Sequence, residues 1–290
     1  MSSQTAVQRD ILRVWDVPPV RQNAIHTVGM VLEPGKFTEF DPFLLLAEDW
    51  FGHGTFDVHP HRGIETVTYV MSGKLNHYDN NFGDGELYPG DVQWMTAGRG
   101  VIHKEDPVEG EMVHSLQLWV NLPRGEKLTE PRYQNLRAKD MPVRSLDGGY
   151  IRVFSGKSGD AVAPTKNHVP VTMVEINLEA GATATQELPI DYRGFLYVLE
   201  GEGEFGTGKT VGKKAQALWL EDVDHPAVGS EASAISDSAV TMRAITPIKV
   251  LLYAGRPLRE PVVAYGPFVM NTREEIAQAF RDYQEGRFGE

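Results

Sequence analysis

The chain has 290 residues, of which 41% are hydrophobic and 23% charged, a composition typical of ordinary soluble globular proteins. It contains no cysteine, which excludes both disulfides and thiolate metal ligands. The formal net charge of −12 argues against sequence-independent binding to nucleic acid, because that binding requires a basic surface. We therefore expect one large or two small domains that hold any transition metal through histidine and carboxylate.

Neither a membrane span nor a secretory signal is predicted. No window approaches the roughly 18 consecutive apolar residues of a transmembrane helix. The sequence at the N-terminus, MSSQTAVQRD, lacks the apolar core of a signal peptide. These features favour a cytoplasmic protein.

Short strands joined by tight turns are predicted through the first 120 residues. Prolines and glycines separate apolar or alternating stretches at 11–14, 25–32, 43–47, 66–71, 74–79, 92–95, 101–105 and 113–120. Residues 50–54 are predicted to form a loop and 80–85 a turn. Short antiparallel strands at this spacing are typical of a β-barrel or a β-sandwich.

The remaining chain contains a weak internal repeat and one helix. Residues 121–148 are richer in proline and charge, which predicts a segment that connects two halves. The stretch 194–202 is similar to 65–74, which suggests two related barrels in tandem. Near the C-terminus, Thr272 and Glu275 fit a capping box and predict a helix over about 272–285.

Two pairs of potential metal ligands lie at the same short spacing. His59 and His61 are two positions apart, as are His103 and Glu105. On a strand this spacing places both side chains of a pair on one face. Three imidazoles and one carboxylate suit iron, manganese, nickel, copper or zinc better than calcium. Pro60 cannot donate to a central ladder, so the first pair is predicted at a sheet edge, a bulge or a barrel rim.

Other histidines and carboxylates have simpler interpretations. Glu65 is predicted to be a structural carboxylate or a hydrogen-bond partner of a ligand imidazole rather than a fifth ligand. His53 and His77 have no partner at a useful spacing and are predicted on the surface or in loops. His114 lies on the apolar face of its strand and is predicted to be packed or hydrogen-bonded.

At this stretch the sequence resembles the pirin family of the cupin superfamily. The resemblance is carried by the segments 59–69 (HPHRGIETVTY), 90–100 (GDVQWMTAGRG), 41–46 (DPFLLL) and 265–272 (YGPFVMNT). It implies an all-β bicupin: two tandem jelly-roll-like barrels packed face to face, with a short C-terminal helix. The expected domains are 1–135, with the metal site, and 136–290, a degenerate cupin with the terminal helix.

The resemblance also implies a mononuclear metal, most often Fe(II), held by His59, His61, His103 and Glu105. Recombinant protein could carry manganese, nickel, copper, cobalt or zinc instead. Some pirins are quercetin 2,3-dioxygenases, so a flavonol dioxygenase that uses O2 is the first hypothesis, with Glu105 as the catalytic base.

Two alternatives remain open. The first is a regulator that senses the redox state of iron and binds a protein partner, and the second is an enzyme for an unrelated small molecule. A monomer is expected, with no direct binding to nucleic acid or membrane.

Overall fold

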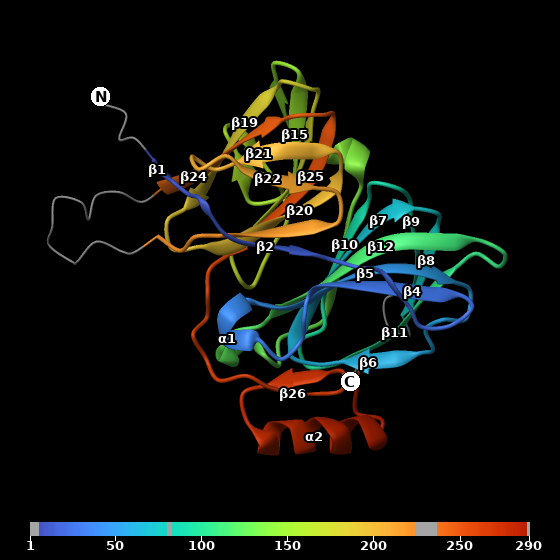
Figure 1. The fold of residues 1–290 in the computed structure, drawn as a ribbon. Helices are drawn as coiled ribbons and strands as arrows, with labels where there is room; N and C mark the ends of the chain where they lie inside the picture. Colours follow the sequence, from blue (N-terminus) through green and yellow to red (C-terminus); the bar gives the residue numbers. More distant parts are fainter. Residues whose placement is uncertain (1–5, 80–82, 224–236, 289–290) are drawn as a thin grey trace, which may run out of the picture. The chain divides into compact units, whose positions relative to one another are not determined.

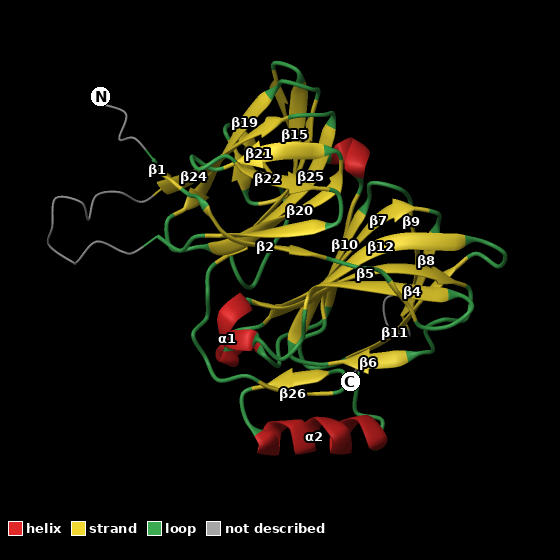
Figure 2. Cartoon of the chain, in the orientation of Figure 1, coloured by secondary structure: helices red, strands yellow, loops and turns green. Residues whose placement is uncertain are grey.

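The computed structural model describes residues 6–79, 83–223 and 237–288. Strands dominate the chain, and Figure 2 shows few helical segments beside them. The chain divides into two compact units. Residues Pro18–Asp140 and Leu258–Glu290 form what we call the histidine unit, and Met1–Val17 and Met141–Pro257 form the second unit. The prediction of an all-β chain with a C-terminal helix is confirmed.

The histidine unit contains a seven-stranded and a four-stranded sheet (Figure 1). In spatial order the larger sheet consists of β13 (Arg132–Leu136), β10 (Val92–Thr96), β7 (Ile64–Ser72), β12 (Met112–Asn121), β5 (Phe43–Gly52), β4 (His26–Leu32) and β3 (Val20–Arg21). The smaller sheet consists of β6 (His59–His61), β11 (Val101–Pro107), β8 (Leu75–Asp79) and β9 (Gly83–Leu87). Three short helices complete the first part of the unit: α1 (Phe37–Phe40), η1 (Arg124–Glu126) and η2 (Ala138–Asp140). Pro60 lies in an edge strand, as its missing N–H predicted.

The C-terminal segment of the histidine unit is a small hairpin followed by a helix. The hairpin pairs β26 (Val263–Tyr265) with β27 (Phe268–Met270), and helix α2 (Arg273–Gln284) lies beside it (Figure 1). The predicted capping box is present: Thr272 Oγ1 accepts from the Glu275 amide, and the Glu275 carboxylate accepts from the Thr272 amide. Ile276 is buried in a cluster with residues of β27.

The second unit also consists of two larger sheets. Its seven-stranded sheet has the order β14 (Val143–Leu146), β15 (Gly149–Ser155), β18 (Val171–Leu178), β25 (Ile248–Gly255), β20 (Arg193–Glu200), β23 (Gln216–Leu220) and β2 (Ile11–Asp16). The other contains β1 (Val7–Gln8), β24 (Asp237–Ala244), β21 (Glu202–Phe205) and β22 (Thr210–Lys213), with β19 (Thr183–Pro189) paired to β24. A further hairpin joins β16 (Lys157–Ser158) to β17 (Ala161–Val162).

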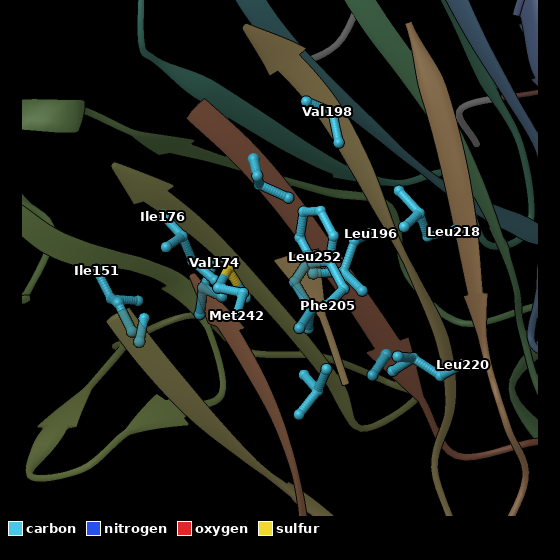
Figure 3. Close-up of a cluster of buried hydrophobic side chains, with 14 of the residues drawn as sticks. Ile151, Val174, Ile176, Leu196, Val198, Phe205, Leu218, Leu220, Met242 and Leu252 are labelled. Atoms are coloured by element: carbon cyan, nitrogen blue, oxygen red, sulfur yellow. The ribbon is translucent and has the colours of Figure 1, made fainter. Parts of the chain in front are cut away.

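Apolar side chains fill the interior of the second unit. Figure 3 shows Phe205 among Leu196, Leu252 and Met242, and all four are buried. These side chains come from both larger sheets, so the unit has a packed hydrocarbon core at the level of this cluster. The described residues of this unit contribute none of the clustered metal-ligating side chains.

The element and domain boundaries differ from the sequence-based expectations in three places. Strand β2 pairs with β23, so the first residues of the chain group with the second unit rather than with residues 18–135, and residues 258–290, with the terminal helix, group with the histidine unit rather than with residues 141–257. Strand β5 continues to Gly52, through part of the predicted loop at 50–54, because β4 and β12 pair with it on both sides. Residues 83–85 of the predicted turn belong to β9, while 80–82 lie outside the described residues. The first two differences depend on pairing partners that are distant in the sequence, which local sequence patterns do not specify. The third is a local hairpin between β8 and β9.

No helix in the described part of the chain is long and apolar enough to cross a membrane.

Candidate metal centre

Neighbouring strands place the predicted ligands of the two pairs on one face. Strand β11 pairs antiparallel with β6, and His103 lies directly opposite His59. Along β11 buried residues alternate with partly exposed ones, so His103 and Glu105 both point inward. On the other side of β11, strand β8 places His77 opposite Glu105.

The structure brings His59, His61 and His103 together. One ring nitrogen from each residue lies within 4.8 Å of those of the other two, an arrangement that could hold a metal ion. The Nε2 atoms of His59 and His103 are 3.0 Å apart. Nδ1 of His59 lies 2.8 Å from the Asp57 carbonyl, to which it can donate, and this leaves Nε2 free to act as a ligand.

His61 carries the clearest sign of a missing partner. Its side chain is buried, and neither ring nitrogen has a hydrogen-bond partner within the described structure. Burial, reinforced by the nearby His59, lowers the pKa of His61 to about 3. Burial likewise lowers the pKa of His103 well below its usual value, with His61 and His59 adding to the effect. Both rings are therefore neutral near pH 7, which is the form of imidazole that binds a metal.

His77 was predicted on the surface or in a loop, and this prediction is wrong. It is buried in the middle of β8, and its Nε2 lies 3.2 Å from Nδ1 of His103. A partner of this kind fixes the tautomer and the orientation of a ligand imidazole. The signal was present in the sequence, because Leu75, His77 and Asp79 alternate with exposed residues along the predicted strand.

Glu105 lies in the same cavity but is held by other side chains. Gln117 Nε2 donates to its Oε2 at 3.0 Å. Thr68 Oγ1 lies 2.9 Å from Oε1 of Glu105 and 2.6 Å from Oε1 of Gln117, and its single proton can go to only one of them at a time. The carboxylate is not a member of the three-histidine group defined above. Local sequence patterns did not reveal Thr68 and Gln117, because the register of β7 with β12 places them opposite each other and they meet Glu105 from a different sheet.

Of the other residues discussed from the sequence, Glu65, His114 and His53 lie outside the cavity lining. Glu65 is fully buried and accepts a hydrogen bond from Thr96 at 2.7 Å. His114 is packed as predicted, with its ring stacked on Trp50 and its Nε2 2.8 Å from Glu48 Oε1. His53 is in a loop, as expected, and its side chain is half exposed. Trp119 does line the cavity, with its ring 5.1 Å from that of His61.

A cavity of about 410 Å³ opens beside the histidines, within the usual range of small-molecule sites. His59, His61 and Glu105 are part of its wall. Most of the rest of the wall is apolar, and it includes Gly266 and Pro267 from the turn of the C-terminal hairpin. The remaining lining residues are Met30, Leu45, Ala47, Asp49, Phe51, Phe56, Thr68, Leu75, Ser115, Gln117 and Trp119.

The loop after His61 is fixed by buried charges. The Arg62 guanidinium forms an ion pair with Asp282 of α2 at 2.7 Å and lies 4.3 Å from the centre of the Phe288 ring. The Lys127 ammonium donates to the carbonyls of Gly63 and Val269 at 2.8 and 2.9 Å, and also to Asn121 Oδ1. The C-terminal segment is thereby tied to the strand that carries two of the three histidines.

Two family models match the chain. The pirin model covers residues 23–120, and the model of the pirin C-terminal cupin domain covers 173–289. Human pirin is 39% identical over 256 residues, which span 88% of this chain and 85% of that protein.

Solved structures agree with this result. A crystal structure of a Geobacillus kaustophilus protein is 57% identical, with a TM-score of 0.85, and the match covers 89% of this chain and all of the other. A quercetin 2,3-dioxygenase from Acinetobacter baumannii is 30% identical, with a TM-score of 0.84, over 98% of this chain and 99% of the other. The chain belongs to the pirin family of bicupin proteins.

Proposed function

We propose that this protein is a metal-dependent dioxygenase that opens the central ring of flavonols such as quercetin. His59, His61, His103 and Glu105 would hold one metal ion, and iron is the proposed native metal. The observation that carries the proposal is the cavity itself, because three clustered imidazoles and a carboxylate lie beside a largely apolar space. The similarity to a protein named as a quercetin 2,3-dioxygenase supports the choice of substrate.

The donor set fits a transition metal. His61 is buried with both nitrogens unpartnered, a costly arrangement for polar atoms unless a ligand satisfies one of them. The three imidazoles suit iron and its neighbours in the first transition row. When bound, such a metal supplies Lewis-acid and electron-transfer chemistry toward the substrate and O2.

The chain would contribute binding, water exclusion and proton transfer. Apolar lining residues such as Leu45, Trp119 and Pro267 would contact the flat rings of the substrate and keep bulk water out. Glu105 would accept the proton of the flavonol 3-hydroxyl and later return it to the carboxylic acid product. Gln117 and Thr68 would hold the carboxylate in position for both steps.

The overall reaction is balanced without an external reductant. Two carbon–carbon bonds of the central ring break, and both atoms of O2 enter the ester product. The carbon between the broken bonds leaves as carbon monoxide.

The test uses protein reconstituted anaerobically with Fe(II) and then supplied with quercetin and O2. We expect O2 uptake that matches quercetin loss, and we expect His103→Ala to lose both metal and activity. The matched control is His114→Ala, which removes a histidine that is paired with Glu48 outside the cavity lining and should leave metal content unchanged. Wild-type protein that binds a full equivalent of iron yet does not consume quercetin would refute the proposed activity.

A further inference from the structure

A second polar group lies in the same cavity, away from the three histidines. Asp49 on β5 and Ser115 on β12 both line the cavity and are only 7% and 3% exposed. They lie directly opposite each other in the antiparallel pairing of these strands. Neither belongs to the group of side chains that could hold a metal.

These two side chains retain unused hydrogen-bonding capacity. His26 Nε2 lies 2.8 Å from Oδ1 of Asp49, which orients the carboxylate. No other hydrogen bond to this carboxylate, and none to the Ser115 hydroxyl, is formed by the described residues. Because both residues line the cavity, their remaining hydrogen-bonding capacity is available to a molecule bound there.

The strand register sets the spacing between Ser115 and Gln117, the residue that donates to Glu105. Ser115 lies two residues before Gln117 on β12, on the same face, and Gln117 holds Glu105. Two residues along an antiparallel strand span about 7 Å. Apolar and aromatic side chains, among them Phe51 and Phe56, also line this cavity. The cavity thus offers two polar positions about one aromatic ring apart within apolar walls.

We propose that Asp49 and Ser115 form a binding subsite for a phenolic hydroxyl on the part of the substrate remote from the cleaved ring. This inference rests on the proposed function and narrows its substrate class to flavonols whose pendant ring is hydroxylated. A phenol O–H donates to the free oxygen of the Asp49 carboxylate, and a hydrogen bond to a charged acceptor is stronger than a neutral one. The Ser115 hydroxyl donates to or accepts from the same group or its neighbour on the ring. His26 is a positioning residue, because it acts only through Asp49.

The test compares two flavonols that differ only on the pendant ring. Quercetin has two hydroxyls there, and galangin has none. Dissociation constants are measured for the Fe(II)-loaded protein without O2, and KM and kcat are measured with O2. Loss of one hydrogen bond to a charged group corresponds to about a tenfold or larger change in affinity. We therefore expect wild-type protein to bind quercetin at least about tenfold more tightly than galangin.

Variants of Asp49 and Ser115 test whether this subsite causes the tighter binding of quercetin than of galangin. Asp49→Ala and Ser115→Ala should each reduce it, mainly through quercetin's dissociation constant and KM, with kcat nearly unchanged. Asp49→Asn keeps the volume of the side chain and serves where Asp49→Ala does not fold. Glu48→Ala is the matched control, since Glu48 is the next residue on β5, is similarly buried and pairs with His114 instead of lining the cavity.

The outcomes separate the subsite from the proposed activity. Discrimination that disappears in the Asp49 and Ser115 variants supports the subsite, even if no turnover is seen. Turnover of both flavonols with equal affinity overturns the subsite and leaves the dioxygenase proposal standing. Equal effects of Glu48→Ala and Asp49→Ala on discrimination would also overturn it, because only one of them faces the cavity.

Discussion

The Arg62 side chain should couple the C-terminal helix to the metal-ligand loop, and its removal should loosen both. Arg62 forms an ion pair with Asp282, and the two side chains are only 8% and 15% exposed, respectively. The Nε of Arg62 also donates to the Arg99 carbonyl at 2.5 Å. Breaking a fully buried pair costs about 3–5 kcal/mol. Arg287 also lies 3.3 Å from Asp282 and would compensate in part. With the stacking on Phe288 also lost, we expect Arg62→Ala to cost about 3 kcal/mol.

Hydrogen–deuterium exchange of the α2 amides measures how much Arg62→Ala destabilises this helix. If α2 opens locally, a loss of about 3 kcal/mol raises the exchange rate of its amides by about a hundredfold. Arg256→Ala is the control, because its ion pair with Asp191 in the second unit is largely exposed and should contribute less than about 1 kcal/mol. Unchanged exchange in α2 in the Arg62→Ala variant would refute the coupling.

Three further predictions follow from single contacts. His77→Ala should weaken metal binding about 10- to 100-fold, whereas His53→Ala should not; equal affinities measured by competition with a chelator would contradict this. Gly63→Ala places a Cβ 2.0 Å from the Val269 carbonyl oxygen at a φ of +80°, so this variant should not form the folded metal site. In the control Gly54→Ala the Cβ meets nothing within 4 Å, and its free energy of unfolding in urea should fall by only about 1 kcal/mol. Burial lowers the pKa of Lys127 from its usual value of 10.5 to about 7. Burying the charged ammonium therefore lowers the free energy of unfolding by its full amount below pH 7, and this destabilisation decreases as the pH rises from 7 to 10.5. The stability of wild-type protein relative to Lys127→Met should therefore increase between pH 7 and 9, and a flat difference would mean that its three oxygen acceptors keep the ammonium charged.

Alternation along single strands was the most informative signal in the sequence. It predicted that His103 and Glu105 share one face, and the burial pattern of β11 shows this. The proline between His59 and His61 predicted an edge strand, a bulge or a barrel rim, and β6 is an edge strand. The same rule applied to residues 74–79 would have predicted a buried His77, but the absence of a second ligand at short spacing hid its role.

Contacts set by long-range register could not be predicted in this way. Thr68 faces Gln117, and Asp49 faces Ser115, only because β12 pairs with β7 and β5 in a particular alignment. Gln117 reaches Glu105 from a different sheet, which no local pattern specifies. Likewise, the sequence of strand β2 does not specify β23 as its partner. Such pairings depend on the packing of the whole unit, so a local pattern identifies strand faces but not their neighbours.

The three imidazoles and Glu105 are proposed to support oxidative opening of a flavonol. The most direct measurement is the carbon monoxide released per quercetin consumed by protein that carries one equivalent of iron. We predict one carbon monoxide per quercetin, with the signal abolished in His61→Ala. Quercetin loss without carbon monoxide, or at the same rate in wild-type and His61→Ala protein, would contradict the account.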